Sequence, residues 1–266
     1  MKKIPVLLAA LIFVHSAHAA ELFGTVEAVS GEVEVLGTNG ERMRVNSGQK
    51  IYEGQTIQTA GNGEVHIVSG DSGLIALRPN SNVRIDRYSA KGEPADESVF
   101  TIFKGAMRSI TGWIAKRNTS AYRINTPTVT IGVRGTDHEI TVIETATGDA
   151  MPGTYDTVNE GVTVIRTPQG ELEVHPGQHV FAARDGHAAP RLLAQHPEFF
   201  MRRQLRIEQR IQQRKENLQQ QVRNIMENRA DTIRENHGDK KPEMQKNREA
   251  IKKRIQERRI RERPKP

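Results

Sequence analysis

The sequence contains no cysteine, which excludes disulfide bonds, thiolate chemistry and attachment of a lipid to a cysteine. Aromatic residues make up only 5% of the 266 residues, and Trp113 is the single tryptophan. After Val14 no apolar run approaches the ~20 residues that a membrane-spanning helix needs. We therefore expect a chain that is held together by burial of aliphatic side chains and by hydrogen bonds.

The first 19 residues have the pattern of a secretory signal peptide. Lys2 and Lys3 precede an apolar run from Ile4 to Val14, and Ala17-His18-Ala19 forms a small-x-small cleavage site. We expect cleavage after Ala19 and export to the periplasm, which leaves a mature chain without a transmembrane segment.

Charge divides the remaining chain into two unlike parts. Residues 20–190 contain 15 Lys and Arg against 21 Asp and Glu, whereas residues 191–266 contain 22 against 11. The glycines and the alternating apolar pattern also stop near Pro190. We predict three parts: a signal peptide at 1–19, an all-β domain at 20–190 and a basic helical tail at 191–266.

Short runs of alternating apolar and polar residues fill the acidic part, as in Gly31-Glu32-Val33-Glu34-Val35. Such alternation is typical of strands with one buried face, and the Gly, Asn and Asp residues between the runs favour turns. The pattern Gly-Glu-(Val/Leu)-x-(Val/Ile) recurs at Gly31, Gly63 and Gly170, which could mark stacked coils or merely turn exits. The pattern predicts an all-β fold, either a sandwich or a compact β-solenoid.

The basic part has a helix-forming composition. Apolar residues from Leu192 and Leu193 to Ile233 follow one another mostly at spacings of three, four and seven, as an amphipathic helix requires. Residues 237–242 contain Gly and Pro and should end this helix. A second helix from Glu243 to about Arg261 could fold back on the first, or the tail could be partly disordered until something binds it.

Four ordered motifs resemble the FecR-domain family. They are Gly48-Gln49-Lys50-Ile51-Tyr52-Glu53-Gly54, Leu77-Arg78-Pro79-Asn80-Ser81, Phe103-Lys104-Gly105, and Thr126-Pro127 followed by Gly132-Val133-Arg134-Gly135-Thr136. The resemblance covers roughly residues 45 to 145. It implies a periplasmic, non-catalytic β domain of the kind that relays iron-siderophore signals to a sigma factor. We expect no counterpart here of the membrane span and cytoplasmic segment of those relay proteins.

The densest cluster of titratable groups is Asp137-His138-Glu139. Neighbouring strand residues point to opposite faces, so Asp137 and Glu139 share one side that His138 cannot join. No hydrolase, zinc or phosphate-loop motif is present. We therefore expect these groups, together with Asp71, His66, His175 and His179, to be surface or turn residues. We expect Trp113 to be a packing residue, and the protein to be no enzyme and to hold no metal or cofactor.

We predict a periplasmic binding or scaffold protein that recognises a protein or envelope component, with a role in envelope signalling as the family suggests. Edge-strand pairing and loop contacts would supply the recognition. The candidate binding residues are cations in the matching motifs and at the start of the tail: Arg78, Lys104, Arg134, Arg202, Arg203, Arg206 and Arg210. The sequence does not fix the oligomeric state.

Two alternatives stay open. In the first, the basic tail binds peptidoglycan or another acidic envelope polymer; export and the lack of aromatic residues after Phe200 argue against nucleic acid. In the second, the basic tail lies on the acidic body and covers a binding face until a partner competes for it.

Overall fold

The computed structural model describes residues 20–238 apart from 119, 147, 149, 196 and 198–204. Within the C-terminal helix it describes the side chains of residues 211–213 and 215–228. The expected signal peptide and the expected second tail helix lie outside the described residues. No helix of the described part is long and apolar enough to span a membrane.

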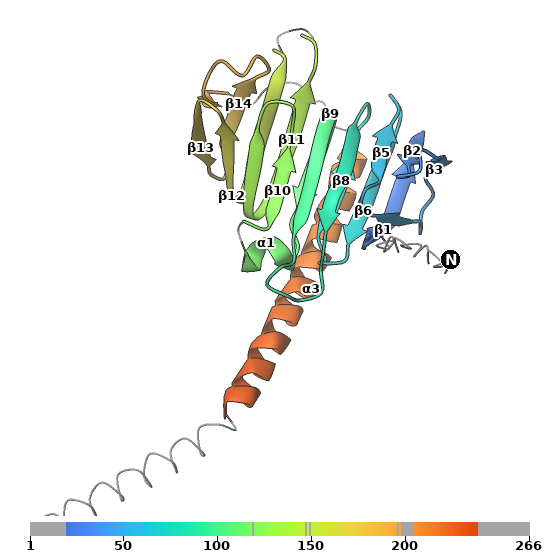
Figure 1. Ribbon diagram of the computed structural model, residues 1–266, viewed down its shortest axis with the longest axis vertical. Coiled ribbons are helices and arrows are strands. Elements are labelled where there is room, and N and C mark those ends of the chain that lie inside the picture. Colours follow the sequence, from blue (N-terminus) through green and yellow to red (C-terminus); the bar gives the residue numbers. More distant parts are fainter. Residues whose placement is uncertain are drawn as a thin grey trace, which may run out of the picture.

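The described residues form fifteen strands and two helices. They are β1 (Leu22–Ser30), β2 (Val33–Leu36), β3 (Arg42–Arg44), β4 (Lys50–Tyr52), β5 (Thr56–Thr59), β6 (Glu64–Ser69), β7 (Leu74–Leu77), β8 (Asn82–Tyr88), β9 (Ser98–Ile110), α1 (Trp113–Arg117), β10 (Tyr122–Asn125), β11 (Thr130–Ile143), β12 (Gly153–Thr167), β13 (Gly170–Val174), β14 (His179–Ala183), β15 (Arg191–Leu193) and α3 (Leu205–Gly238). The prediction of an all-β body followed by a helical extension is confirmed (Figure 1).

The strands form two layers that share three long strands. Layer 1 has the order β4-β1-β6-β7-β9-β11-β12-β14-β15, and layer 2 has the order β3-β2-β5-β8-β9-β10-β11-β12-β13. Strands β9 and β11 start in layer 2 and end in layer 1, whereas β12 runs the other way. Among the described strands every pair is antiparallel except β9 with β10. These pairings make a β-sandwich rather than a solenoid.

Each long strand crosses between the layers at a glycine with positive φ. These glycines are Gly105 (φ 88°), Gly135 (φ 58°) and Gly161 (φ 74°). Only glycine adopts this backbone region without steric cost. Space is limiting as well, because a Cβ at Gly161 would lie 2.2 Å from the carbonyl oxygen of Gly135. The Arg134-Gly135-Thr136 motif therefore serves backbone geometry at a layer crossing.

The core lies between the two layers. It consists mainly of Val, Ile and Leu from both layers, with Phe23 at its centre. The Phe23 ring meets the Tyr88 ring edge-on at 5.0 Å and the Phe100 ring at 5.5 Å. Trp113 of α1 closes one end of this core, and the prediction that it is a packing residue is confirmed.

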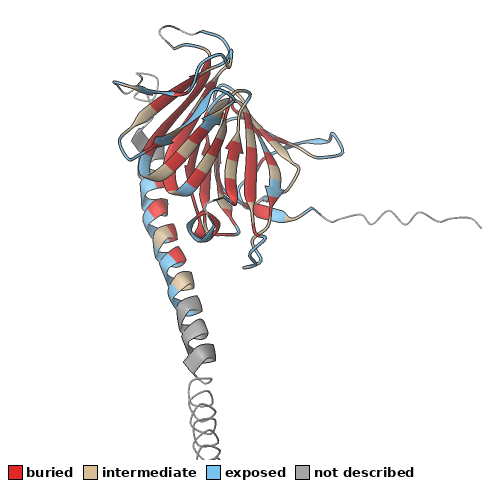
Figure 2. Cartoon of the chain, turned by 60° about the vertical axis from the view of Figure 1, so that its left-hand side comes forward, coloured by how far each residue is buried: buried red, intermediate tan, exposed pale blue. Residues whose placement is uncertain are grey.

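Helix α3 lies against the outer face of layer 1 and then projects beyond the sandwich (Figures 1 and 2). The structure describes α3 as far as Gly238, so the predicted break at residues 237–242 stays a prediction. The placement of Leu192 and Leu193 on its apolar stripe is wrong, because both belong to strand β15. Pairing with β14 at the sheet edge overrides the helical spacing of these two residues.

The crossing glycines generate a prediction for stability. Gly161→Ala should lower the free energy of unfolding by ~3 kcal/mol or more, because it adds a steric clash to an unfavourable φ. Gly177→Ala is the matched control: it also has positive φ, but nothing lies within 4 Å of the added methyl group. That variant should lose only ~1 kcal/mol. Urea unfolding of both variants measures the difference, and equal losses would contradict the steric argument.

Candidate functional site

Charged side chains of layer 1, together with Lys215 of α3, form a row on the outer face of this layer. We call this row the charged seam. Its members are Glu64, His66, Arg78, Arg108, Asp137, Glu139, Glu160 and Lys215. The register produces this row, since Glu139 lies opposite Arg108, Arg108 opposite Ala76, and Ala76 opposite His66. All members except Glu160 are buried. Buried charges on this scale require partners, and the seam supplies them.

Asp137 is the centre of the seam. Its carboxylate accepts hydrogen bonds from Nε and Nη2 of Arg108, at 2.9 and 3.0 Å, and from Nζ of Lys215 at 2.6 Å. Burial by itself would raise the pKa of Asp137, but the hydrogen bonds and charges of Arg108 and Lys215 lower it to about 2. Asp137 is therefore ionised at neutral pH, although its side chain is only 1% exposed.

Lys215 attaches α3 to two strands at once. Besides Asp137 on β11, its Nζ contacts Oε1 of Glu160 on β12 at 2.8 Å. Burial would lower the pKa of Lys215, but these two carboxylates raise it above its ordinary value. Gln219, one helical turn further, donates to Oε2 of Glu160 at 3.3 Å. The Glu160 side chain is 56% exposed, so the seam opens to solvent at this end.

Apolar contacts flank the Lys215 ion pairs. Ile211 and Leu218 of α3 pack with Leu74, Ala76 and Ile110 on the outer face of layer 1. Val222 joins the main core further along. These three positions confirm part of the predicted apolar stripe. Lys215 lies on the same face and was missed; a lysine four residues after Ile211 and three before Leu218 was the available signal.

The other end of the seam contains Arg78. Its Nη1 lies 3.4 Å from Glu64 Oε1, and its Nη2 lies 3.6 Å from Glu139 Oε2. His66 Nε2 contacts Glu64 Oε1 at 2.8 Å. Arg78, expected at an exposed turn, is buried instead, because carboxylates on β6 and β11 draw its side chain onto the outer face of layer 1.

The other predicted binding residues do not gather at one place. Lys104 and Arg134 are exposed, and each immediately precedes a crossing glycine. They lie at opposite ends of the layer, because Gly105 pairs with Val142 whereas Asp137 pairs with Ile110. Arg202 and Arg203 lie outside the described residues. Arg206 and Arg210 belong to α3, but their side chains are not among those described.

The cluster Asp137-His138-Glu139 splits between the two faces as predicted. Asp137 and Glu139 point outward into the seam, while His138 points into the sandwich. There His138 Nδ1 lies 2.8 Å from Asp156 Oδ1, and Asp156 Oδ2 accepts a hydrogen bond from Thr163 at 2.7 Å. Both His138 and Asp156 have fully buried side chains. The pair therefore has no access to a substrate.

The expectation that these titratable groups are surface or turn residues is wrong for most of them. Asp137, His138, Glu139 and His66 are buried strand residues. Asp71 is buried as well, but it lies in the turn between β6 and β7, as expected. His175 is exposed and His179 is half-buried. Within the described part of the chain, no group of three His, Asp or Glu side chains could hold a metal ion.

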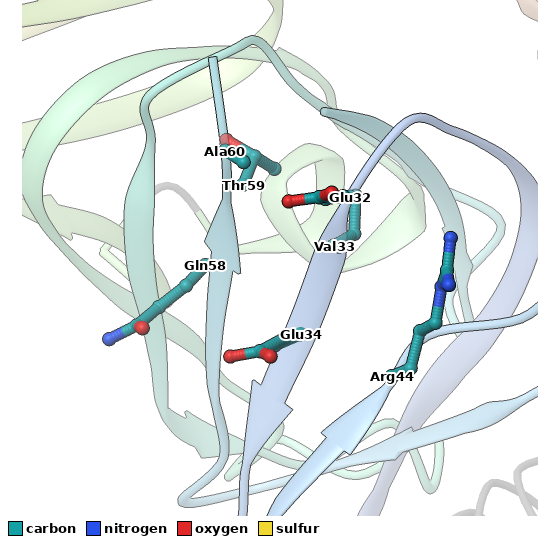
Figure 3. Close-up of a pocket in the computed structure, with 7 residues that line it drawn as sticks. All are labelled: Glu32, Val33, Glu34, Arg44, Gln58, Thr59 and Ala60. Carbon is teal, nitrogen blue, oxygen red and sulfur yellow. The ribbon is translucent and has the colours of Figure 1, made fainter. Parts of the chain in front are cut away.

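An open hollow of about 370 Å³ lies on the outer face of layer 2 (Figure 3). Glu34, Gln58 and Arg44, from the neighbouring strands β2, β5 and β3, line it together with Glu32. Glu34 and Gln58 both accept from Arg42 Nη1 at 3.4 Å. Glu34 and Gln58 are thus already occupied by Arg42, and the lining side chains are mostly exposed, so the hollow is a weaker candidate site than the seam.

The fold and the seam define a β-sandwich that uses its charged face to hold a helix. A family model described as FecR protein matches residues 55–152, from the start of β5 to the start of β12. The chain therefore contains a FecR domain, as its motifs predicted. Arg108 and Asp137 lie inside the matched segment, whereas Glu160 and α3 follow it.

The chain is also similar to two crystal structures, at 1.65 and 2.50 Å, of a protein described as a "putative anti-sigma factor" from Parabacteroides distasonis ATCC 8503. In each case the sequence identity is 10% and the TM-score is 0.41. The similarity covers 55% of this chain and spans 62% of that chain. No curated protein matches the chain.

The attachment of α3 gives a mutational prediction. Lys215→Met should lower the free energy of unfolding by ~2 kcal/mol, because Asp137 keeps Arg108 but loses one of its two cations. Hydrogen exchange of the amides of residues 211–222 should accelerate. Arg223→Met is the matched control on an exposed face of the same helix and should stay within ~0.5 kcal/mol of the wild type. Unchanged exchange in Lys215→Met would show that the ion pair does not hold α3.

The lowered pKa of Asp137 gives a prediction for pH. A carboxyl whose pKa falls from 3.8 to about 2 on folding adds stability that is complete above pH 3.8 and is lost as the pH falls through 2. The loss is ~2 kcal/mol. Urea unfolding between pH 5 and pH 2 should therefore show a shallower pH dependence for Asp137→Asn than for the wild type. The exposed Asp185→Asn is the control, and equal slopes for Asp137→Asn and wild type would refute the assignment.

Proposed function

We propose that the protein is a non-catalytic binding protein of the bacterial envelope, exported by its signal peptide, whose FecR-containing sandwich recognises a protein partner in envelope signalling. The FecR match supports the envelope and the signalling role. The observation that carries the proposal is the contact between Asp137 and Lys215. Asp137 directly follows the Arg-Gly-Thr motif in the sequence. The charged groups of this domain hold a polypeptide segment and are not arranged around a substrate.

The chemistry of the seam fits recognition of protein better than catalysis. Asp137 is kept ionised and saturated by two cations, so it has no proton to give and no free lone pair aimed at a cavity. His138 is sealed inside the sandwich with Asp156. A face that combines apolar contacts with a buried ion pair is the usual means of fixing the register of a bound helix.

A second candidate function is binding of an acidic envelope polymer by the basic tail. Helix α3 projects beyond the sandwich, which places its far end where another surface can reach it (Figure 1). Residues 239–266 add 12 Lys and Arg against 5 Asp and Glu. Cationic side chains at this density attract polyanions, and the attraction weakens with salt.

Affinity capture from periplasmic extract separates the two functions. The baits are the full mature chain and the same chain with Lys252→Glu, Lys253→Glu, Arg258→Glu and Arg259→Glu, each at low and high salt. We expect both baits to retain the same protein at high salt, because recognition resides in the sandwich. Retention of polymer by the unaltered bait alone, lost at high salt, would overturn the proposal in favour of the tail.

A further inference from the structure

The contact between α3 and layer 1 defines a short recognition pattern. Among the described side chains of α3 the buried ones are Ile211, Lys215, Leu218 and Val222. The pattern begins with an apolar residue, Ile211, and has a cation four positions later, at Lys215. Two further apolar residues follow seven and eleven positions after Ile211. This spacing places all four on one helical face.

The site selects for both parts of that pattern. Leu74, Ala76 and Ile110 give the apolar contact for Ile211 and Leu218. Between those contacts the carboxylates of Asp137 and Glu160 converge on one cationic head group. A helix without a cation at this position would leave Asp137 with only one of its two cationic partners. An arginine would serve as well as a lysine, because its guanidinium can donate to both carboxylates at once.

The same pattern occurs a second time in the tail. Met244, Arg248, Ile251 and Ile255 repeat the spacing of Ile211, Lys215, Leu218 and Val222, 33 positions further along the chain. These are the only two windows in residues 191–266 in which Ile, Leu, Val, Met or Phe occupies the apolar positions and Lys or Arg the fourth position after the first. Two further residues coincide, since Gln212 matches Gln245 and Glu216 matches Glu249.

We propose that residues 244–255 are a second ligand for the α3 site of the same chain, and that the two segments compete for it. The apolar side chains of the second segment are as large as those they replace, so the area available for burial is similar. Attachment to the same chain gives the second segment an effective concentration of up to the millimolar range. The competition does not depend on which outside partner the protein recognises.

Exchange between the two segments has a structural consequence. When residues 244–255 occupy the site, Leu74, Ala76 and Ile110 stay covered, so no apolar patch is opened on the sandwich. At the same time Lys215 and its apolar neighbours are released for binding elsewhere. The tail would thus present either of its two segments without exposing the face of layer 1.

Disulfide trapping tests the proposal in the full chain, which contains no native cysteine. One double variant combines Ala76→Cys with Leu218→Cys, which belongs to the same apolar cluster when α3 occupies the site. The other combines Ala76→Cys with Ile251→Cys, the position of the second segment that matches Leu218. Arg254→Cys is the control partner, because it matches Gln221, which is exposed in α3. In a glutathione buffer we expect intramolecular disulfides for Leu218→Cys and Ile251→Cys, formed at least ~10-fold faster than for Arg254→Cys.

Charge variants then test the competition. Lys215→Glu should at least double the trapping of Ile251→Cys, because it places a carboxylate beside Asp137 and disfavours α3; Arg248→Glu should reduce that trapping. Leu74→Cys replaces Ala76→Cys if that substitution disturbs the fold, as judged by urea unfolding. Trapping of Ile251→Cys no faster than of Arg254→Cys, a product that is a disulfide-linked dimer, or no response to Lys215→Glu would each overturn the proposal.

Discussion

The structure depends on the way one buried carboxylate is neutralised. Transfer of an ionised Asp137 out of water costs several kcal/mol unless its charge is matched, and Arg108 and Lys215 provide the match. Arg108 comes from the adjacent strand, but Lys215 comes from the helix. Without α3, the carboxylate would lose one partner and the apolar residues of layer 1 beside it would face water. The acidic body and the first part of the basic tail are therefore one folded unit, although their composition suggested two.

The position of the FecR match gives this unit a simple division. The matched segment supplies Glu64, Arg78, Arg108, Asp137 and Glu139, which make up most of the seam. The elements after the match supply Glu160, Lys215 and the apolar face of α3. The domain thus provides a site, and the rest of this chain provides what occupies it.

Local patterns in the sequence predicted the local features of the structure. Alternation predicted the strands, the helical spacing predicted the apolar positions Ile211, Leu218 and Val222, and strand geometry placed Asp137 and Glu139 on one face. The seam itself could not be predicted from local patterns. Its bonds join residues 29 positions apart, as in Arg108 with Asp137, or 78 apart, as in Lys215 with Asp137. Arg78 and His66 were misjudged for the same reason, since burial of a charge depends on partners that only the tertiary fold brings together.

The strands that the two layers share affect how the protein unfolds. In a sandwich of two independent sheets, one sheet can loosen while the other persists. Here β9, β11 and β12 each belong to both layers, so a strand that leaves one layer pulls on its continuation in the other. Local opening of the interior is therefore coupled across the whole body, and partly unfolded forms that retain one intact layer are disfavoured. For a protein that lacks disulfide bonds, this cooperativity is itself a protection against proteases, which act on segments that open independently.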